Sequence, residues 1–538
     1  MTEHEADLVI RAASIHTLVP DQQPQRALAV RGDRIVALST DSVGLADWVT
    51  ACTTVLDLPE ATVTPAFDDT HTHLIFAGHS ARDVPVHQAG TIPEFLDLIR
   101  QRAASTPEGD WIRTTTNWQE INLRERRMPT AAELDTATDR HPVLVKRGGH
   151  NDVANSYLLR LAGITENTPV PTGGVIERDA GGTLTGRLID TAMGLVERLL
   201  PAADPADRVA GLRIASSQYA ATGIGTVRDC AVSPDDFLAL LASREAGALH
   251  TRVRALISAI GLTSAAELTD LLDTMEDWRY RGDPWLRVWG VKFCLDGGLE
   301  AAATEQPYHN DHDFCGTLLW EPPALVEAVE AVVSRGWRVG THANGDRAVR
   351  VLLDVYEQVL RRNPGLPAGA LVMEHGSLAG PEQRARAVAL GVPVTIQQPL
   401  LHDTAEVGIG FWGEQRVSDL FPAREWLDDG ALVTAGSDFP VGQFGAMRSI
   451  WGMTTRQTVA GVQGAQHAVS YAEAVAMHTT NAARLLGETD LRGMLTTGRL
   501  ADLTSWPRDP ALCAPNELRD LNPTHTILGG RFVHGQKP

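Results

Sequence analysis

Two histidines one residue apart are the first sign of chemistry in this sequence. A short predicted strand over 64–73 ends with His71 and His73. Alternate residues of a strand point to the same face, so both imidazoles should converge on one spot. Two neutral imidazoles in that arrangement suit a borderline metal such as zinc. Alone, the pair is explained as well by two polar residues at a strand end.

Further candidate ligands occur where later apolar runs stop. Three such runs end at His342, His375 and Asp438. A lone histidine in such a place is more often a structural residue with satisfied hydrogen bonds. Five candidates at the same ends of successive strands are hard to attribute to chance, because parallel strands bring their carboxyl ends together. We therefore expect one site with all five residues.

A lysine inside an apolar strand adds a sixth candidate. Lys292 lies in the run 290–295, where burying an ammonium would be costly. It can pair with a carboxylate such as Asp296. Alternatively, burial favours the neutral amine, which can capture carbon dioxide and form an anionic carbamate that bridges two metals. Both interpretations stay open from the residues alone.

Alternating strand and helix patterns must position these residues. Such alternation predicts parallel strands with helical crossovers, and eight units close best as a (β/α)8 TIM barrel of the α/β class. The eight predicted strands are Ala66–His73, Gly225–Asp229, Arg252–Ser258, Trp289–Leu295, Trp337–Ala343, Leu371–Gly376, Val392–Gln397 and Ala431–Asp438.

The rest of the chain surrounds this predicted barrel in two ways. Both ends are rich in short strands and turns, so we expect 1–62 and 495–538 to form one composite β-sandwich, with 63–494 as the barrel domain. The interval after the first barrel strand is far longer than an ordinary crossover. We therefore predict an insertion subdomain at about 80–215, with strands of its own at Trp111–Trp118 and Val143–Arg147.

Composition narrows the classes of partner. Asp plus Glu exceed Lys plus Arg by 67 to 47, which argues against nucleic acid and anionic membranes because both need a basic footprint. The five cysteines are odd in number and form no C-x-x-C pair, as in a protein kept reduced in the cytoplasm. We expect no signal peptide, no membrane span and a small-molecule substrate, and we leave a homodimer open.

Several motifs together resemble the amidohydrolase superfamily. The similarity is greatest to its family 3 branch, which includes YtcJ-like proteins and N-substituted formamide deformylase. The motifs that carry it are Asp69-Thr70-His71-Thr72-His73, Val291-Lys292-Phe293, Asp296-Gly297, His342-Ala343-Asn344-Gly345-Asp346, Glu374-His375-Gly376, Gln398-Pro399, Gly436-Ser437-Asp438-Phe439-Pro440 and Gly498-Arg499-Leu500-Ala501-Asp502.

The resemblance implies a division of labour in the site. His71 and His73 would bind one metal, His342 and His375 a second, and Lys292 would bridge them as a carbamate. The implied cofactor is one or two divalent ions, Zn²⁺ first. The implied activity is hydrolysis of a non-peptide C–N bond, in an amide or formamide, by metal-activated water. Asp438 would move the proton between water and leaving nitrogen, with Lys292 and His342 also catalytic.

Substrate contacts and rival functions complete the predictions. We assign substrate binding to His150, Asp296 and Phe439, although His150 is explained equally well as a solvated loop histidine. A heterocycle deaminase is the nearest rival, and one metal beside an unmodified lysine would favour it. An inactive metal-binding or regulatory homologue is a rival from another class, against which the retained Asp438 argues. A lyase on the same barrel ranks lowest.

Overall fold

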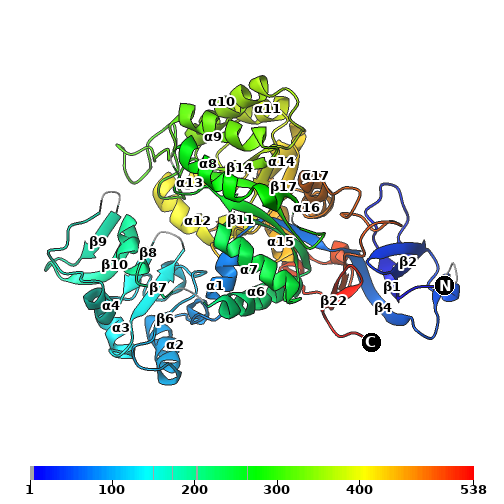
Figure 1. Ribbon diagram of the computed structural model, residues 1–538, viewed down its shortest axis with the longest axis horizontal. Helices are drawn as coiled ribbons and strands as arrows, with labels where there is room; N and C mark the ends of the chain where they lie inside the picture. Colours follow the sequence, from blue (N-terminus) through cyan, green and yellow to red (C-terminus); the bar gives the residue numbers. More distant parts are fainter. Residues whose placement is uncertain (1–4, 149–150, 172–173, 202–203, 263, 281) are drawn as a thin grey trace. The chain divides into compact units, whose positions relative to one another are not determined.

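Eight parallel strands form the central sheet of the protein. The computed structural model describes residues 5–148, 151–171, 174–201, 204–262, 264–280 and 282–538. Neighbouring strands follow the order β17-β16-β15-β14-β13-β12-β11-β5, and every pair is parallel. These strands are β5 (Phe67–Thr72), β11 (Ile224–Val232), β12 (Arg252–Ser258), β13 (Leu286–Cys294), β14 (Arg338–Ala343), β15 (Leu371–His375), β16 (Val394–Ile396) and β17 (Val433–Ala435). Several of them are labelled in Figure 1.

Hydrogen bonds between the first and last strands close this sheet into a barrel. The backbone N–H of Asp438 donates to the carbonyl of His71 at 2.8 Å. The Thr70 hydroxyl donates to the carbonyl of Ala435 at 2.9 Å. The predicted (β/α)8 TIM barrel is therefore confirmed, with all eight predicted strands present.

Amphipathic helices cover the outside of the barrel. In α10 (Asp346–Arg362), buried residues recur every three or four positions, among them Leu352, Tyr356 and Val359. Tyr356 also donates a hydrogen bond from its hydroxyl to Thr341 in β14 at 2.8 Å. The other helices after the barrel strands are α7 (Pro234–Glu245), α8 (Ala265–Thr274), α9 (Pro322–Ser334), α11 (Pro381–Ala389), α12 (Gln398–Trp412), α13 (Glu414–Ser418), α14 (Ala423–Asp428), α15 (Ala446–Thr455), α16 (Tyr471–Met477) and α17 (Thr480–Leu486).

The two ends of the chain share one seven-stranded sheet. Its order is β22-β21-β20-β4-β1-β2-β3. The strands are β1 (Leu8–Ile15), β2 (Gln25–Arg31), β3 (Arg34–Ser39), β4 (Thr54–Pro65), β20 (Leu503–Trp506), β21 (His525–Leu528) and β22 (Arg531–His534), with α18 (Pro515–Leu518) between β20 and β21. The two ends meet where β20 pairs antiparallel with β4. Residues such as Leu8, Leu56, Leu503 and Ile527 bury a common apolar cluster there.

The insertion has a five-stranded sheet of its own, in the order β6-β7-β8-β10-β9. Its elements are α2 (Ile92–Ser105), β6 (Ile112–Arg113), α3 (Ala131–Ala137), β7 (Val143–Arg147), β8 (Asn151–Ala154), α4 (Ser156–Leu161), β9 (Gly174–Arg178), β10 (Leu184–Asp190) and α5 (Gly194–Glu197). The predicted strand over Trp111–Trp118 shortens to β6. Strand β8 escaped prediction because it begins with two polar residues, Asn151 and Asp152.

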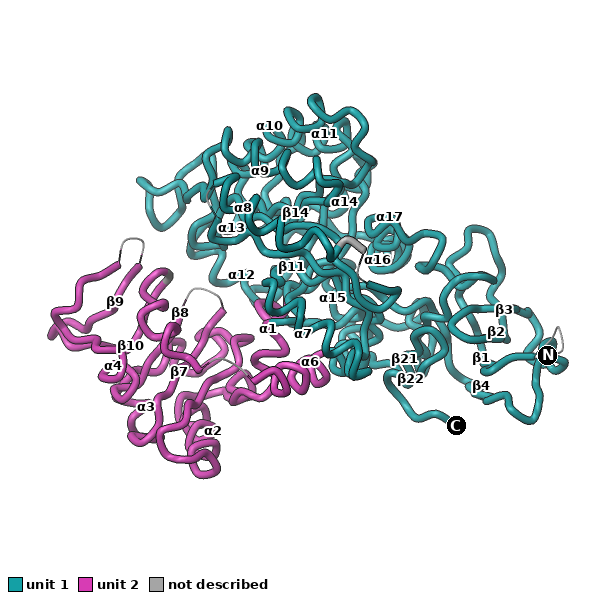
Figure 2. Tube along the Cα trace, in the orientation of Figure 1, with its two compact units in different colours: residues 1–75, 216–438, 443–538 teal, residues 76–215, 439–442 magenta. Residues whose placement is uncertain are grey.

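Two compact units divide the chain, as Figure 2 shows. One contains 1–75, 216–438 and 443–538, and the other contains 76–215 and 439–442. Helices α1 (Leu74–Ser80) and α6 (Pro205–Ala220) cross from one unit to the other, and a small hairpin, β18 (Gln457–Thr458) with β19 (Gly461–Val462), belongs to the first unit. The domain boundaries predicted from the sequence stay a prediction. Among the described helices, none has the length and apolar character needed to cross a membrane.

Candidate metal centre

The six candidate ligands lie at the carboxyl end of the barrel strands. In the parallel register, Ala343 of β14 is opposite His375 of β15, and Cys294 of β13 is opposite His342. On the far side of the barrel, Asp438 follows β17 and bonds to the backbone of His71 in β5. The shared strand ends thus bring residues separated by more than three hundred positions to one place.

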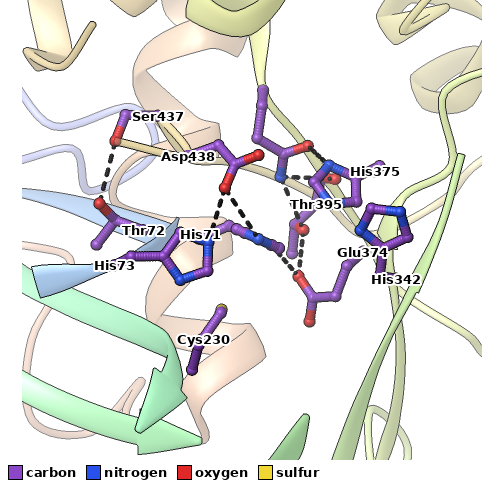
Figure 3. A network of polar contacts seen from close by, with 12 residues as sticks. His71, Thr72, His73, Cys230, His342, Glu374, His375, Thr395, Ser437 and Asp438 are labelled. Carbon is purple, nitrogen blue, oxygen red and sulfur yellow. Dashed lines mark hydrogen bonds and ion pairs between the residues drawn. The ribbon is translucent and has the colours of Figure 1, made fainter. Parts of the chain in front are cut away.

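Short distances join all six side chains. Nε2 of His73 lies 2.9 Å from Oδ1 of Asp438, and Nε2 of His71 lies 3.5 Å from the same oxygen. Nζ of Lys292 is 3.3 Å from Nε2 of His71. The imidazole centroids of His71 and His375 are 4.6 Å apart, and those of His375 and His342 are 4.5 Å apart. Figure 3 labels five of the six, namely His71, His73, His342, His375 and Asp438.

Unusual backbone angles aim two of these side chains. His375 has a φ of 72° and Asp438 a φ of 57°, in the left-handed region that side chains other than glycine seldom adopt. In a regular strand Glu374 and His375 would face opposite sides. Here both reach His71, one by a hydrogen bond and the other by ring contact. Non-glycine residues in this conformation are found preferentially at functional sites.

Burial keeps the imidazoles of His71, His342 and His375 neutral, while Asp438 stays charged. Burial, helped by the charge of Lys292, lowers the pKa of His71 to about 4. Burial lowers the pKa of His375 to about 3 and that of His342 well below its usual range. Burial alone would raise the pKa of Asp438, but the hydrogen bond from His73 and the nearby imidazoles hold it well below its usual range. Near pH 7 the site therefore offers neutral nitrogen donors and an anionic oxygen.

These donors fit a divalent metal ion. Single ligand atoms of His71, His73 and Asp438 all lie within 4.8 Å of one another. Nitrogen from imidazole and oxygen from carboxylate are ligands of zinc in hydrolytic sites. The Nδ1–H of His71 bonds to Glu374 at 2.7 Å, which leaves Nε2 of that ring with its lone pair on the side of Asp438.

A buried acid–base pair supports the site from inside the barrel. Glu374 bonds to the guanidinium of Arg228, whose Cζ lies 4.5 Å from the ring centroid of Trp289. Sequence reasoning assigned no role to Glu374 or Arg228. The only available signals were a carboxylate directly before His375 and a cation within an apolar strand.

A second trio of donors near Glu374 does not suit a metal. His71, Cys230 and Glu374 also converge within 4.8 Å. However, the charge of Glu374 is already balanced by Arg228, and burial raises the pKa of the Cys230 thiol, which metals bind as thiolate. We therefore interpret this trio as support for His71.

Asp296 holds two loops together beside His342. Its carboxylate accepts backbone hydrogen bonds from Ala303, Asn344 and Gly345 at 2.9–3.0 Å. Burial raises its pKa to about 7. Its substrate-binding role stays a prediction. Across the described ion pairs, none joins Lys292 to Asp296, so the structure does not provide the pairing considered for that lysine.

The two remaining substrate-binding candidates, His150 and Phe439, are not among the six side chains of this cluster. His150 lies outside the described residues. Phe439 follows Asp438 directly but is grouped with the second compact unit, where it is buried. Their roles stay predictions.

Comparisons with known proteins agree with this architecture. A model of the amidohydrolase family matches residues 54–534. The chain is 30% identical over 537 residues to N-substituted formamide deformylase of Arthrobacter pascens, covering 97% of each protein. It is 27% identical over 521 residues to protein LONG AFTER FAR-RED 3 of Arabidopsis thaliana, covering 92% of this chain and 86% of that one.

A solved structure shares the whole fold. An uncharacterized metal-dependent hydrolase from Pyrococcus horikoshii OT3 superposes with a TM-score of 0.75 at 23% identity. The match covers 95% of this chain and 99% of the other. With the barrel and its cluster of histidines in place, the extent of the family match shows that the protein belongs to the amidohydrolase family.

Proposed function

We propose that this protein is a metal-dependent hydrolase that cleaves a non-peptide C–N bond, in an amide or formamide of a small molecule. The observation that carries the proposal is the contact of two histidines, His71 and His73, with the charged carboxylate of Asp438. Such a set can bind a metal ion and can also accept and donate a proton during catalysis. The relative named as an N-substituted formamide deformylase, similar over nearly the whole chain, supports the choice of bond.

The same donor set defines the proposed metal sites. His71, His73 and Asp438 would hold one divalent ion, with Zn²⁺ the first choice for nitrogen and carboxylate ligands. His342 and His375 would hold a second divalent ion. Lys292 would be a ligand shared by the two ion positions. When bound, such an ion lowers the pKa of water from about 15.7 to about 7 and polarises a carbonyl group.

Asp438 is the proposed proton carrier. Its carboxylate is almost fully buried and is held in the charged form by His73, so it can accept a proton from the attacking water. The same oxygen can then give that proton to the nitrogen that leaves, so the proton is conserved over one turnover. A second ion, or His342 or His375, would polarise the carbonyl oxygen. Nε2 of His342 lies 3.1 Å from the carbonyl oxygen of Gly297 and 3.0 Å from Nδ2 of Asn344.

Lys292 is proposed to act as a carbamate. Its amine would form a bond to the carbon of CO2 and release one proton, which converts a cation into an anionic oxygen ligand. The residue is buried, and its nitrogen contacts a candidate ligand, His71, rather than a carboxylate. An ammonium there would repel a bound cation, whereas a carbamate would attract it.

Compartment and partners follow as further parts of the proposal. All five cysteines are free thiols, which supports a reducing compartment, the cytoplasm. We propose a small-molecule substrate and neither nucleic acid nor a membrane as partner, in line with the acidic composition.

A metal-controlled substrate screen tests the function. The purified protein is stripped with a chelator, reloaded with Zn²⁺, and supplied with N-formyl amines, N-acyl amines, cyclic amides and amino-substituted heterocycles. We expect the reloaded form to release an amine from an amide or formamide and the stripped form to be inactive. Release of ammonia from heterocycles alone would replace this proposal with a deaminase, and activity that is indifferent to metal would refute both.

A further inference from the structure

A chain of buried polar side chains runs beneath the histidines, inside the barrel. Thr395 in β16 donates its hydroxyl hydrogen to Oε2 of Glu374 at 2.6 Å. The same hydroxyl accepts a hydrogen bond from Nε2 of Gln397 at 3.2 Å, and Nε2 of Gln397 also donates to the Thr395 carbonyl at 3.1 Å. All three side chains are fully buried. Glu374 and Thr395 are labelled in Figure 3 beside His71 and His375.

Each end of this chain accepts a hydrogen bond from one histidine. Oε2 of Glu374 lies 2.7 Å from Nδ1 of His71, and Oε1 of Gln397 lies 2.7 Å from Nδ1 of His375. A carboxylate has no hydrogen to give, so Nδ1 of His71 is the donor. The amide of Gln397 uses its nitrogen on Thr395, so its oxygen faces His375 and Nδ1 of that ring is the donor as well. In both rings the lone pair is therefore on Nε2.

We propose that Glu374, Thr395 and Gln397 form one positioning unit that sets His71 and His375 in the same tautomer and orientation for metal binding. This inference rests on the proposed metal-dependent function. The two acceptors come from β15 and the end of β16, and Thr395 links them. A substitution at Gln397 should therefore also alter the orientation of His71. A partner that fixes the second ring nitrogen of a ligand histidine typically contributes 10–100-fold to metal affinity.

The barrel provides room and charge balance for the unit. Arg228 bonds to Glu374 from the opposite side and donates to the carbonyl of Thr70 at 2.6 Å. Gly340 of β14 leaves the space, because a Cβ there would lie 2.3 Å from Oε1 of Glu374. Residues of β5, β11 and β14 thus surround the charged end of the unit. Gln397 has no charge and no ion pair, so it can be altered without exposing a buried charge.

The test therefore starts at Gln397 and Thr395. Gln397→Met removes both the acceptor for His375 and the donor to Thr395. Thr395→Val removes the link, and Thr395→Ser restores it. The readouts are zinc affinity, measured by competition with a chromophoric chelator, and the visible absorption spectrum of Co²⁺ bound to the protein. Gln358→Met, at an exposed position on α10, is the matched control.

We expect Gln397→Met and Thr395→Val to lose about 10–100-fold in zinc affinity and to shift the Co²⁺ spectrum. Thr395→Ser and the control should stay near wild type. Folded Gln397→Met protein with wild-type affinity and spectrum would overturn the positioning role. If that variant fails to fold, Thr395→Val decides in the same way. A wild-type protein that takes up no metal would overturn both this inference and the proposed function.

Discussion

At the residue scale, the site depends on burial acting in opposite directions on bases and acids. Burial lowers the pKa of His71 to about 4, so the imidazole is neutral and its lone pair is available near pH 7. Burial alone would also neutralise Asp438, but His73 and the neighbouring imidazoles keep it charged. Neutral nitrogen beside charged oxygen is what both metal binding and proton transfer require.

Replacing the proposed proton carrier should separate these two tasks. Asp438→Asn keeps an oxygen that can ligate but cannot accept a proton from water. We expect metal content to remain and turnover to fall by about 10²–10⁴-fold. Metal analysis and initial rates on the substrate found by screening measure this. Asp428→Asn, an exposed carboxylate on α14, is the control. Near-normal turnover of Asp438→Asn would mean that another group carries the proton.

The meeting of the candidate ligands could be predicted from the sequence, whereas the residues that hold them in place could not. His342, His375 and Asp438 each end an apolar run, His71 ends a further strand, and the barrel topology alone brings such ends together. Glu374, Thr395 and Gln397 are different, because their partners lie on other strands. The ring of His71, for example, is 303 positions from Glu374. Sequence spacing holds no information about such pairs.

At the element scale, close approach between strands decides where side chains fit. Gly340 allows β14 to lie close to the side chains of Glu374 and Arg228. A Cβ added at this position would be 2.3 Å from Oε1 of Glu374 and 2.9 Å from Nη2 of Arg228. We expect Gly340→Ala to reduce stability by about 1–3 kcal/mol through overpacking and to weaken metal binding. Thermal unfolding and chelator competition measure the two effects. Gly365→Ala, where the added carbon meets nothing within 4 Å, is the control. Unchanged metal affinity in Gly340→Ala would speak against this packing argument.

A buried acid in the insertion should make its stability depend on pH. Asp152 in β8 is fully buried, and over the described residues its carboxylate accepts no hydrogen bond, with Nζ of Lys146 3.9 Å away. Burial raises its pKa from 3.8 to about 7. As pH rises, the unfolded chain loses this proton first, so folding loses stability between about pH 4 and pH 7.

The variant Asp152→Asn tests this pH dependence. It cannot ionise, so the wild type should lose up to about 4 kcal/mol relative to it between pH 4 and pH 7. Thermal unfolding of both proteins at several pH values gives the difference. Parallel curves for wild type and variant across that range would show that Asp152 ionises normally in the folded protein.

The elements themselves were predictable to different degrees. Most barrel strands lie in apolar runs that alternate with helical patterns, so their number and order followed from periodicity. The insertion has strands of two to seven residues. The polar residues Asn151 and Asp152 at the start of β8 give that strand no apolar pattern. Short strands with polar residues depend on their neighbours in space, which a local pattern does not contain.

At the scale of the whole molecule, one buried ion pair ties the carboxyl-terminal strands to the barrel. Arg252 of β12 donates two hydrogen bonds of 2.7 Å to the carboxylate of Asp502, directly before β20. The N–H of Gly529 bonds to the same carboxylate at 2.8 Å. The pair therefore connects the terminal sheet with the barrel, within one compact unit.

Breaking this pair should destabilise the protein strongly. Asp502→Ala leaves the buried guanidinium of Arg252 without its partner, which typically costs about 3–5 kcal/mol. Chemical denaturation of the metal-loaded protein measures the loss. Asp520→Ala removes an exposed partner of Arg519 and should change stability by less than about 1 kcal/mol. Equal effects of the two variants would contradict a connecting role for Asp502.

The most direct test of the central claim is an anomalous diffraction map of the zinc-loaded protein, collected at the zinc edge. We predict a peak between His71, His73 and Asp438, with ligand atoms about 2.0–2.2 Å from the ion. We also predict one extra carboxyl group in the density on Nζ of Lys292, beside a second peak at His342 and His375. Zinc bound elsewhere, with these residues free of metal in a fully loaded crystal, would contradict the proposed metal-dependent hydrolase.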